Sequence, residues 1–213
     1  MKSKINFILI LIILIFIYIF LLSINYTQAV SLNLSDSVFR LHIIANSDSS
    51  DDQNLKLKVR DNIIDYMNTL TENTSNKDEV ISIASNHLNT FKEIALNTIK
   101  DNGYNYNVNI EIGNFYFPTK SYSNISFPAG NYDALKIEIG KAIGQNWWCV
   151  LFPPLCFVNS TTGIVPEDSK NILKENMDSE SYKLINEGNN NETNTSDIKI
   201  KFKIIEFFNN LKK

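Results

Sequence analysis

The first part of the chain is an unbroken apolar run, and it constrains the fold more than any other feature. Every residue from Phe7 to Leu22 is Phe, Ile, Leu or Tyr. With Ile5 and Ile24, the stretch approaches the roughly 20 residues that span a bilayer. A helix of a soluble core rarely lacks a polar face over this length. The run therefore predicts a membrane or signal helix, and the remaining residues must build a core without it.

Charges around the run predict its orientation. Lys2 and Lys4 precede it, and no Asp or Glu occurs before Asp36. Positive charge stays on the cytoplasmic side, so we expect the rest of the chain to be exported. The small side chain of Ala29 permits cleavage after it, whereas the length of the run favours an anchor. Both alternatives stay open: residues 1–29 are a signal peptide or an uncleaved membrane anchor.

The exported part has the size and charge of one acidic domain. About 184 residues follow Ala29, enough for one sizeable core and too few for two comfortable ones. Without Lys2 and Lys4 the formal charge falls from −3 to −5. A mildly acidic surface argues against nucleic acid as a partner and against anionic lipid. We therefore expect a single domain over residues 36–213, with the N-terminal segment as its link to the membrane.

Hydrophobic periodicity predicts an α+β domain with a mixed or antiparallel sheet packed by helices. Apolar residues three or four apart predict helices, and alternation predicts strands. A change of apolar parity after Gly113 predicts a bulge or bend. The polar stretch at about 161–197 is expected to be a mobile loop holding at most one short helix near 169–177. The expected elements are strands at 38–45, 104–112 and 132–139 and helices at 52–70, about 76–102 and 198–211. Alternation at the start of the last segment leaves a strand-like beginning open there.

Motifs for catalysis, cofactor binding and metal binding are missing from the sequence. His42 lies in an apolar strand and His87 on a helix, positions where a hydrogen-bonded core histidine is more common than a ligand. Asp48, Asp51 and Asp52 lack the spacing of a calcium loop, and helix capping explains them more simply. We expect no catalytic, cofactor or metal site. An exported hydrolase using His42, Asp48 and Asp52 remains the alternative, as does a cell-wall-binding module.

Two segments are more specific than packing requires, and they supply the candidate partner-binding residues. The first runs from Arg40 into the helix that follows, and the second is the string NWWCVLFPPLCF. Successive side chains of a strand point to opposite faces, so adjacent tryptophans need one exposed or a second covering element. An exposed Trp beside Pro and Phe is typical of a protein-binding surface. The candidates are Arg40, His42, Asn46, Asp48, Lys56, Arg60, Trp147, Trp148, Phe152, Pro153 and Pro154.

The two cysteines, Cys149 and Cys156, permit one disulfide in an exported chain. In a hairpin centred between Phe152 and Pro153, the two cysteines lie directly opposite each other. Opposed residues on antiparallel strands come within disulfide reach. The alternative is a pair of buried free thiols acting as small hydrophobic side chains.

Three segments together resemble a known family. RLHIIANSDSSDDQNLKLKVRD, FPAGNYDALKIEIGKAIGQNWWCVLFPPLCFV and the closing IKFKIIEFF are similar to the stage II sporulation protein R family of endospore-forming bacteria. The resemblance covers about Val38 to Phe208, apart from the polar stretch.

The resemblance implies a signalling function. Members of this family are made in the forespore and exported into the space between its two membranes. There they activate a membrane-embedded aspartic protease of the mother cell, which removes the pro-segment of a mother-cell sigma factor. The family member is itself not an enzyme. The expected partners are therefore that protease and, through the N-terminal segment, a membrane.

Overall fold

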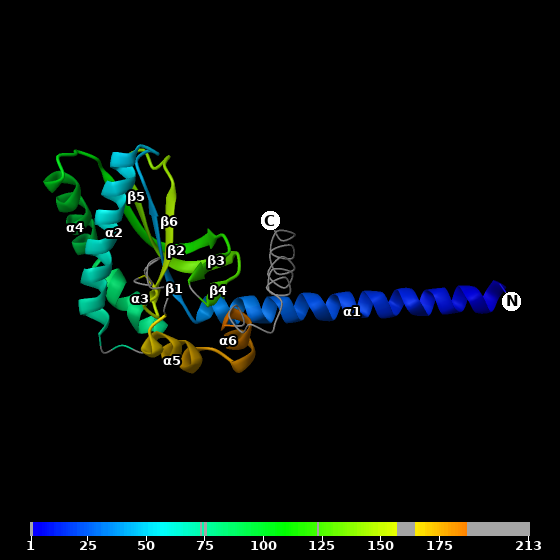
Figure 1. Cartoon of the computed structure of the whole chain (residues 1–213). Coiled ribbons are helices and arrows are strands. Elements are labelled where there is room, and N and C mark those ends of the chain that lie inside the picture. The colour runs from blue at the N-terminus through cyan, green and yellow to red at the C-terminus, as the bar shows by residue number, and fades with distance from the viewer. Residues whose placement is uncertain (1, 73, 75, 123, 157–164, 187–213) are drawn as a thin grey trace.

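The computed structural model describes residues 2–72, 74, 76–122, 124–156 and 165–186. A long helix leads into a domain in which helices lie on both sides of a central sheet (Figure 1). The elements are α1 (Lys2–Asp36), β1 (Phe39–Ile44), α2 (Ser50–Thr71), α3 (Lys77–Asn86), α4 (Leu88–Asp101), β2 (Val108–Phe117), β3 (Lys120–Tyr122), β4 (Ile125–Phe127), β5 (Gly130–Ile139), β6 (Asn146–Phe152), α5 (Glu167–Asn176) and α6 (Ser179–Asn186).

The sheet has the strand order β2-β5-β1-β6. β1 and β5 are parallel, with Leu41 opposite Leu135. The β1–β6 and β2–β5 pairs are antiparallel. β3 and β4 form a separate two-stranded hairpin. The sheet is therefore mixed, and the predicted α+β fold with helices packed on a mixed sheet is confirmed.

One face of the sheet packs against α2, α3 and α4. Leu41 and Ile137 point from the strands into this core, which α2 closes with Leu55, Val59 and Ile63, all at most 2 % exposed. The helix is amphipathic, as its sequence predicts. The Ser49 side chain caps its first turn by accepting a hydrogen bond from the Asp52 backbone amide at 3.2 Å.

The expected single helix at about 76–102 is two helices, so that prediction is wrong. α3 ends and α4 begins at His87, whose backbone leaves the helical conformation with φ −108° and ψ 11°. His87 Nδ1 lies 2.7 Å from the Tyr66 hydroxyl, on α2. The break lets Val80 of α3 and Phe91 of α4 both reach the core under α2. The apolar spacing continues across the break, which is why the sequence pattern hides it.

β2 is a continuous strand without a bulge after Gly113, so the predicted bulge is wrong. Its pairing with β5 keeps one register from Val108 to Phe117. The apolar parity changes because the two ends of the strand serve different cores. Val108 faces the helix-side core, while Phe117 enters a second core on the opposite face. A strand that crosses between two cores must switch the side on which it is apolar.

This second core lies on the other face of the sheet. It is closed by the end of α1, the β3–β4 hairpin, α5 and α6. Leu34 of α1, Leu173 of α5 and Ile185 of α6 are fully buried in it. The expected loop at about 161–197 thus holds two packed helices within 165–186. Its remaining parts, and the helix expected at 198–211, lie outside the described residues.

The end of α1 is fastened to the domain by polar contacts as well. Lys77 Nζ donates to the Ser35 carbonyl oxygen at 2.8 Å and forms an ion pair with Asp133 at 2.7 Å. Ser37 Oγ donates to the Asn176 carbonyl oxygen, also at 2.8 Å. The helix therefore enters the domain without an intervening linker.

The described apolar side chains of α1, from Phe7 to Leu22, are exposed. Among the residues that the structure describes, no helix reaches the combination of length and apolarity that a membrane span requires. The membrane helix expected from the sequence is therefore not confirmed.

Candidate partner-binding surface

Apart from Arg40, His42 and Arg60, whose contacts are described below, the candidate residues from the sequence lie at three places. Asn46, Asp48 and Lys56 surround the turn between β5 and β6, here called the β5–β6 turn and defined as Gly140–Gln145. The two tryptophans lie on opposite faces of β6. Phe152, Pro153 and Pro154 lie at the far end of β6. The sequence segments are thus adjacent in space but do not form one continuous surface.

Side chains from the β1–α2 segment hold the backbone of the β5–β6 turn. Asn46 Oδ1 accepts a hydrogen bond from the Lys141 amide at 2.9 Å. Asp48 Oδ1 accepts one from the Gln145 amide at 2.7 Å. Lys56 Nζ donates to the Gln145 carbonyl oxygen at 2.9 Å. Each of these three polar side chains therefore has a structural partner within the chain.

Further hydrogen bonds orient the side chains of Asn46 and Lys56, which hold the turn. Asp52 accepts hydrogen bonds from Asn46 Nδ2, at 2.8 Å, and from the Ser47 hydroxyl. Burial acts to raise the pKa of Asp52, but hydrogen bonds with Ser47, Asn46, Tyr106 and Ser49 together outweigh burial and lower that pKa. Gln53 Oε1 accepts from Lys56 Nζ at 2.6 Å, and burial lowers the pKa of Lys56. The motif is a polar network that fixes one turn.

The two glycines of the turn lie where no side chain fits. A Cβ on Gly140 would overlap the Asn46 side chain, and Gly140 has a φ of +60°. A Cβ on Gly144 would overlap the carbonyl oxygen of Ser47. The Gly144 amide donates to the Ala45 carbonyl oxygen at 3.0 Å, so the two segments touch along their backbones. Glycine is required here by close approach.

The adjacent tryptophans are both covered, each by a different element. Trp147 lies on the helix side, where the guanidinium carbon of Arg60 sits 4.2 Å from its ring centroid. Trp148 lies on the other face and stacks on His42, with ring centroids 3.6 Å apart. Both indoles are half-buried. Arg60 thus packs on Trp147, and His42 packs on Trp148. In each pair the two residues come from segments that are far apart in the sequence.

Arg40 is completely buried within the second core. Its guanidinium carbon lies 4.1 Å from the Phe117 ring centroid and 4.7 Å from that of Tyr132. Nη2 donates to the Tyr122 hydroxyl at 3.0 Å, while Nε and Nη1 have no hydrogen-bond partner among the described residues. No carboxylate among those residues forms an ion pair with it. Aromatic rings therefore hold this cation.

His42 does not contact Asp48 or Asp52, the acidic residues of the hydrolase alternative. Its Nε2 lies 2.7 Å from Asn146 Oδ1, so the proton is on Nε2 and the buried Nδ1 has no partner. Burial lowers the pKa of His42, against a smaller opposing effect of the Asn146 hydrogen bond. The residue faces away from α2, which carries Asp52. The geometry gives no support to the hydrolase alternative.

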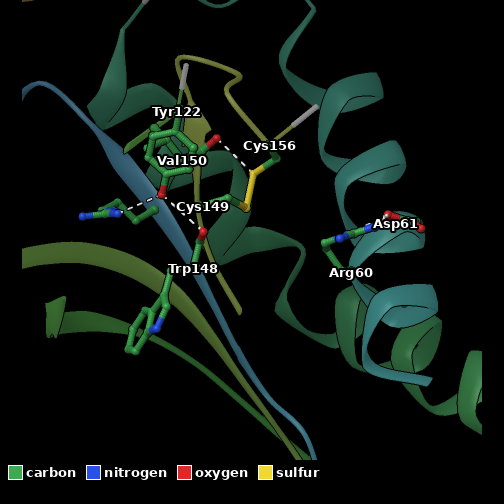
Figure 2. Close-up of a disulfide and its surroundings, with 8 residues drawn as sticks. Arg60, Asp61, Tyr122, Trp148, Cys149, Val150 and Cys156 are labelled. Atoms are coloured by element: carbon green, nitrogen blue, oxygen red, sulfur yellow. Dashed lines mark hydrogen bonds and ion pairs between the residues drawn. A yellow bond between two sulfur atoms is a disulfide. The ribbon is translucent and has the colours of Figure 1, made fainter. Parts of the chain in front are cut away.

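A disulfide joins Cys149 and Cys156, whose Cα atoms are 5.2 Å apart. Figure 2 shows it between β6 and the segment that follows this strand, beside α2, which carries the labelled Arg60 and Asp61. The Leu155 amide donates to the Val150 carbonyl oxygen at 3.1 Å, and the Cys156 sulfur touches the same oxygen. Phe152 and Pro153 are buried and Pro154 is half-buried. The segment from Cys149 to Cys156, here called the disulfide hook, is therefore folded back on itself, and the Phe152 ring is not exposed.

A family model for stage II sporulation protein R matches residues 35–162. The match includes the polar network, the β5–β6 turn and the disulfide hook. The chain belongs to the stage II sporulation protein R family. The stage II sporulation protein R of Bacillus subtilis (strain 168) is 33 % identical over 187 residues, covering 84 % of this chain and 83 % of that protein. No solved structure matches.

Membership of the stage II sporulation protein R family gives the chain a role in sporulation. The polar network and the hook are therefore features of a sporulation protein. One exposed residue of the turn that this network holds, Ile143, was not among the sequence candidates. Its signal in the sequence was an isoleucine in a turn flanked by glycines, a position where a large apolar side chain has no packing role.

Proposed function

We propose that this protein is an exported sporulation signal that activates a membrane-embedded aspartic protease of the mother cell. The protease then removes the pro-segment of a mother-cell sigma factor. The observation that carries the proposal is the family match over residues 35–162 together with the similarity to the Bacillus subtilis protein. The protein acts by binding and is not the protease.

We further propose that the chain works in the space between the forespore and mother-cell membranes, released or held by α1. The positive residues before the apolar run and the absence of acidic residues before Asp36 support export. A disulfide between Cys149 and Cys156 suits an exported protein more than a cytosolic one.

The fold supports a binding role through rigidity. A sheet braced on both faces and a turn held by a polar network present a preformed surface, which lowers the entropic cost of association. The buried or hydrogen-bonded states of His42, Asp48 and Asp52 leave no nucleophile–base pair among them.

The test is reconstitution of the signal in a cell that does not sporulate. The full chain is co-expressed with the candidate protease and its pro-sigma substrate, and cleavage is followed by immunoblot. Processing is expected only when all three proteins are present. A protease variant lacking one active-site aspartate is the matched control. Absence of processing with well-expressed partners, or processing without this chain, would refute the proposal.

A further inference from the structure

The central sheet has two outer strands, β6 and β2, whose edges are closed to different extents. At the β6 edge, the Tyr122 hydroxyl donates to the Trp148 carbonyl oxygen at 3.2 Å. The disulfide hook covers the same edge, since the Leu155 amide donates to the Val150 carbonyl oxygen at 3.1 Å. β2, the longer outer strand, has no further strand beside it among the described residues. An open strand edge is a template for pairing with another segment.

The ladder between β2 and β5 shows which backbone groups of β2 point away from the sheet. The Gly140 amide donates to the Asn107 carbonyl oxygen at 2.8 Å. In an antiparallel pair, every second residue bonds to the partner strand with both its amide and its carbonyl oxygen. Counted from Asn107, the residues between are Val108, Ile110 and Ile112, whose backbone groups therefore point outward. No described residue hydrogen-bonds to these outward groups, so a further strand would satisfy them.

The two faces of this edge differ in their chemistry. On the helix side, Ile110 and Ile112 are only half-buried at the rim of the core. On the other side, Glu111 is exposed. Lys136 lies 3.4 Å from Glu111 but only 2.6 Å from Glu138, so Glu111 has the weaker ion pair of the two. A strand that matches this edge needs apolar residues on one face and basic residues on the other.

The chain itself contains a segment with this pattern. Residues 198–204, here called the C-terminal segment, have the sequence IKIKFKI, in which isoleucine or phenylalanine alternates with lysine. Isoleucine and phenylalanine are residues that favour strands. Both patterns have a period of two. Every register that places the apolar residues of the segment beside Ile110 and Ile112 therefore places a lysine opposite Glu111.

The linker to the C-terminal segment is long enough to reach the edge. α6 ends at Asn186, and Ile185 lies in the second core together with Phe117, the last residue of β2. Residues 187–197 span at most about 36–40 Å. A segment that arrives at the Phe117 end runs back along β2, antiparallel to it. A parallel arrangement would first have to pass the length of β2, roughly 34 Å, which leaves little linker for the distance from α6.

We propose that the C-terminal segment binds the free edge of β2 as a fifth, antiparallel strand of the sheet. One register keeps the whole segment on β2 and also covers Val108. In this register Lys201 lies opposite Glu111. Phe202 and Ile200 flank Lys201 and extend the helix-side core over the rim at β2. With the β2 edge occupied, the sheet has no open edge that could pair with other exported chains.

A pair of cysteines in the full chain tests the contact and its register. Glu111→Cys combined with Lys201→Cys is expected to form a second disulfide within one chain, because opposed residues on antiparallel strands come within disulfide reach. Lys58→Cys with Lys201→Cys is the matched control, since Lys58 is exposed on α2, and it should leave two alkylated thiols. The bonds are mapped by mass spectrometry without reductant. Free thiols in the Glu111 pair would overturn the proposal. A bond between two chains, seen as a dimer on a non-reducing gel, would overturn it in favour of a second copy.

Hydrogen exchange measures the same edge without added cysteines. The Ile110 and Ile112 amides should exchange at least about tenfold more slowly in the parent protein than in Ile200→Pro, because proline removes a ladder hydrogen bond. Asn191→Pro, which lies in the linker, should leave both rates unchanged. The Glu111 amide bonds to β5, so its unchanged exchange shows that the sheet of each variant is folded. Equal rates at Ile110 and Ile112 in the parent protein and in folded Ile200→Pro would refute the fifth strand.

Discussion

Replacing Arg40 by Met tests whether the buried cation supports the fold or awaits a partner. Arg40 is completely buried, with Phe117 and Tyr132 at 4.1 and 4.7 Å and one hydrogen bond to Tyr122. Two desolvated cation–π contacts contribute about 2 kcal/mol each. The charged hydrogen bond adds roughly 1.5–3 kcal/mol.

The cost of burying the Arg40 guanidinium is similar in size to the stabilisation from these contacts. Removing a guanidinium from water costs several kcal/mol, and Nε and Nη1 lack hydrogen-bond partners among the described residues. Methionine fills much of the same space and needs no hydration. The free energy of unfolding of Arg40→Met should therefore lie within about 2 kcal/mol of that of the parent protein. Arg40→Ala leaves a cavity and should be roughly 2–5 kcal/mol less stable than Arg40→Met.

Urea unfolding of the purified protein, followed by tryptophan fluorescence, measures both differences. Trp148 contacts Phe117, with ring centroids 4.7 Å apart, so its emission reports on this core. A loss above about 4 kcal/mol in Arg40→Met would refute the balance drawn here. Equal stability of the Met and Ala variants would show that the side chain is not packed. Normal stability of Arg40→Met with complete loss of protease activation would restore a partner-binding role.

Lowering the pH from 7.5 to 5.5 should destabilise the parent protein more than His42→Gln. Burial lowers the pKa of His42 in the folded state below its value of 6.5 in the unfolded state. As the pH is lowered, the unfolded state therefore takes up the proton before the folded state does, and the free energy of unfolding decreases. Equal pH slopes in urea unfolding would contradict this. Leu55→Ala should cost roughly 2–5 kcal/mol, whereas Lys58→Ala, at an exposed position of α2, should change little; equal thermal midpoints would remove α2 from the core. Replacing both cysteines by Ser should cost about 2.5 kcal/mol, from the short loop that the disulfide closes. Two alkylated cysteines in active protein, seen by mass spectrometry without reductant, would contradict the bond.

The elements predicted well are those whose pattern serves one core. Leu55, Val59 and Ile63 share one helix face, and all three are buried against the sheet. β2 was predicted less well because its two ends face different cores, which changes the side on which its residues are apolar. That change suggested a bulge, which is absent from the pairing of β2 with β5. α5 lies close to the short helix expected near 169–177. α6 was not predicted, because it buries few apolar residues, such as Ile185, among many polar ones.

The candidate site was harder to predict because its partners are distant in sequence. The charge of Arg40 suggested a surface residue, yet Phe117, Tyr122 and Tyr132 enclose it. Asn46 reads as a turn residue, and nothing near it in the sequence shows that it holds the Lys141 amide. Tertiary contacts of this kind have no local signal.

The position of β1 at the centre of the sheet has a consequence for timing. β1 is made first among the strands, but its neighbours β5 and β6 begin at Gly130 and Asn146. Such non-local pairing gives a high contact order, which slows folding. A chain that emerges from its N-terminus cannot complete the sheet until β6 has followed. Shortened translation products therefore lack the folded domain, and a signal that depends on it begins only after most of the chain has been made.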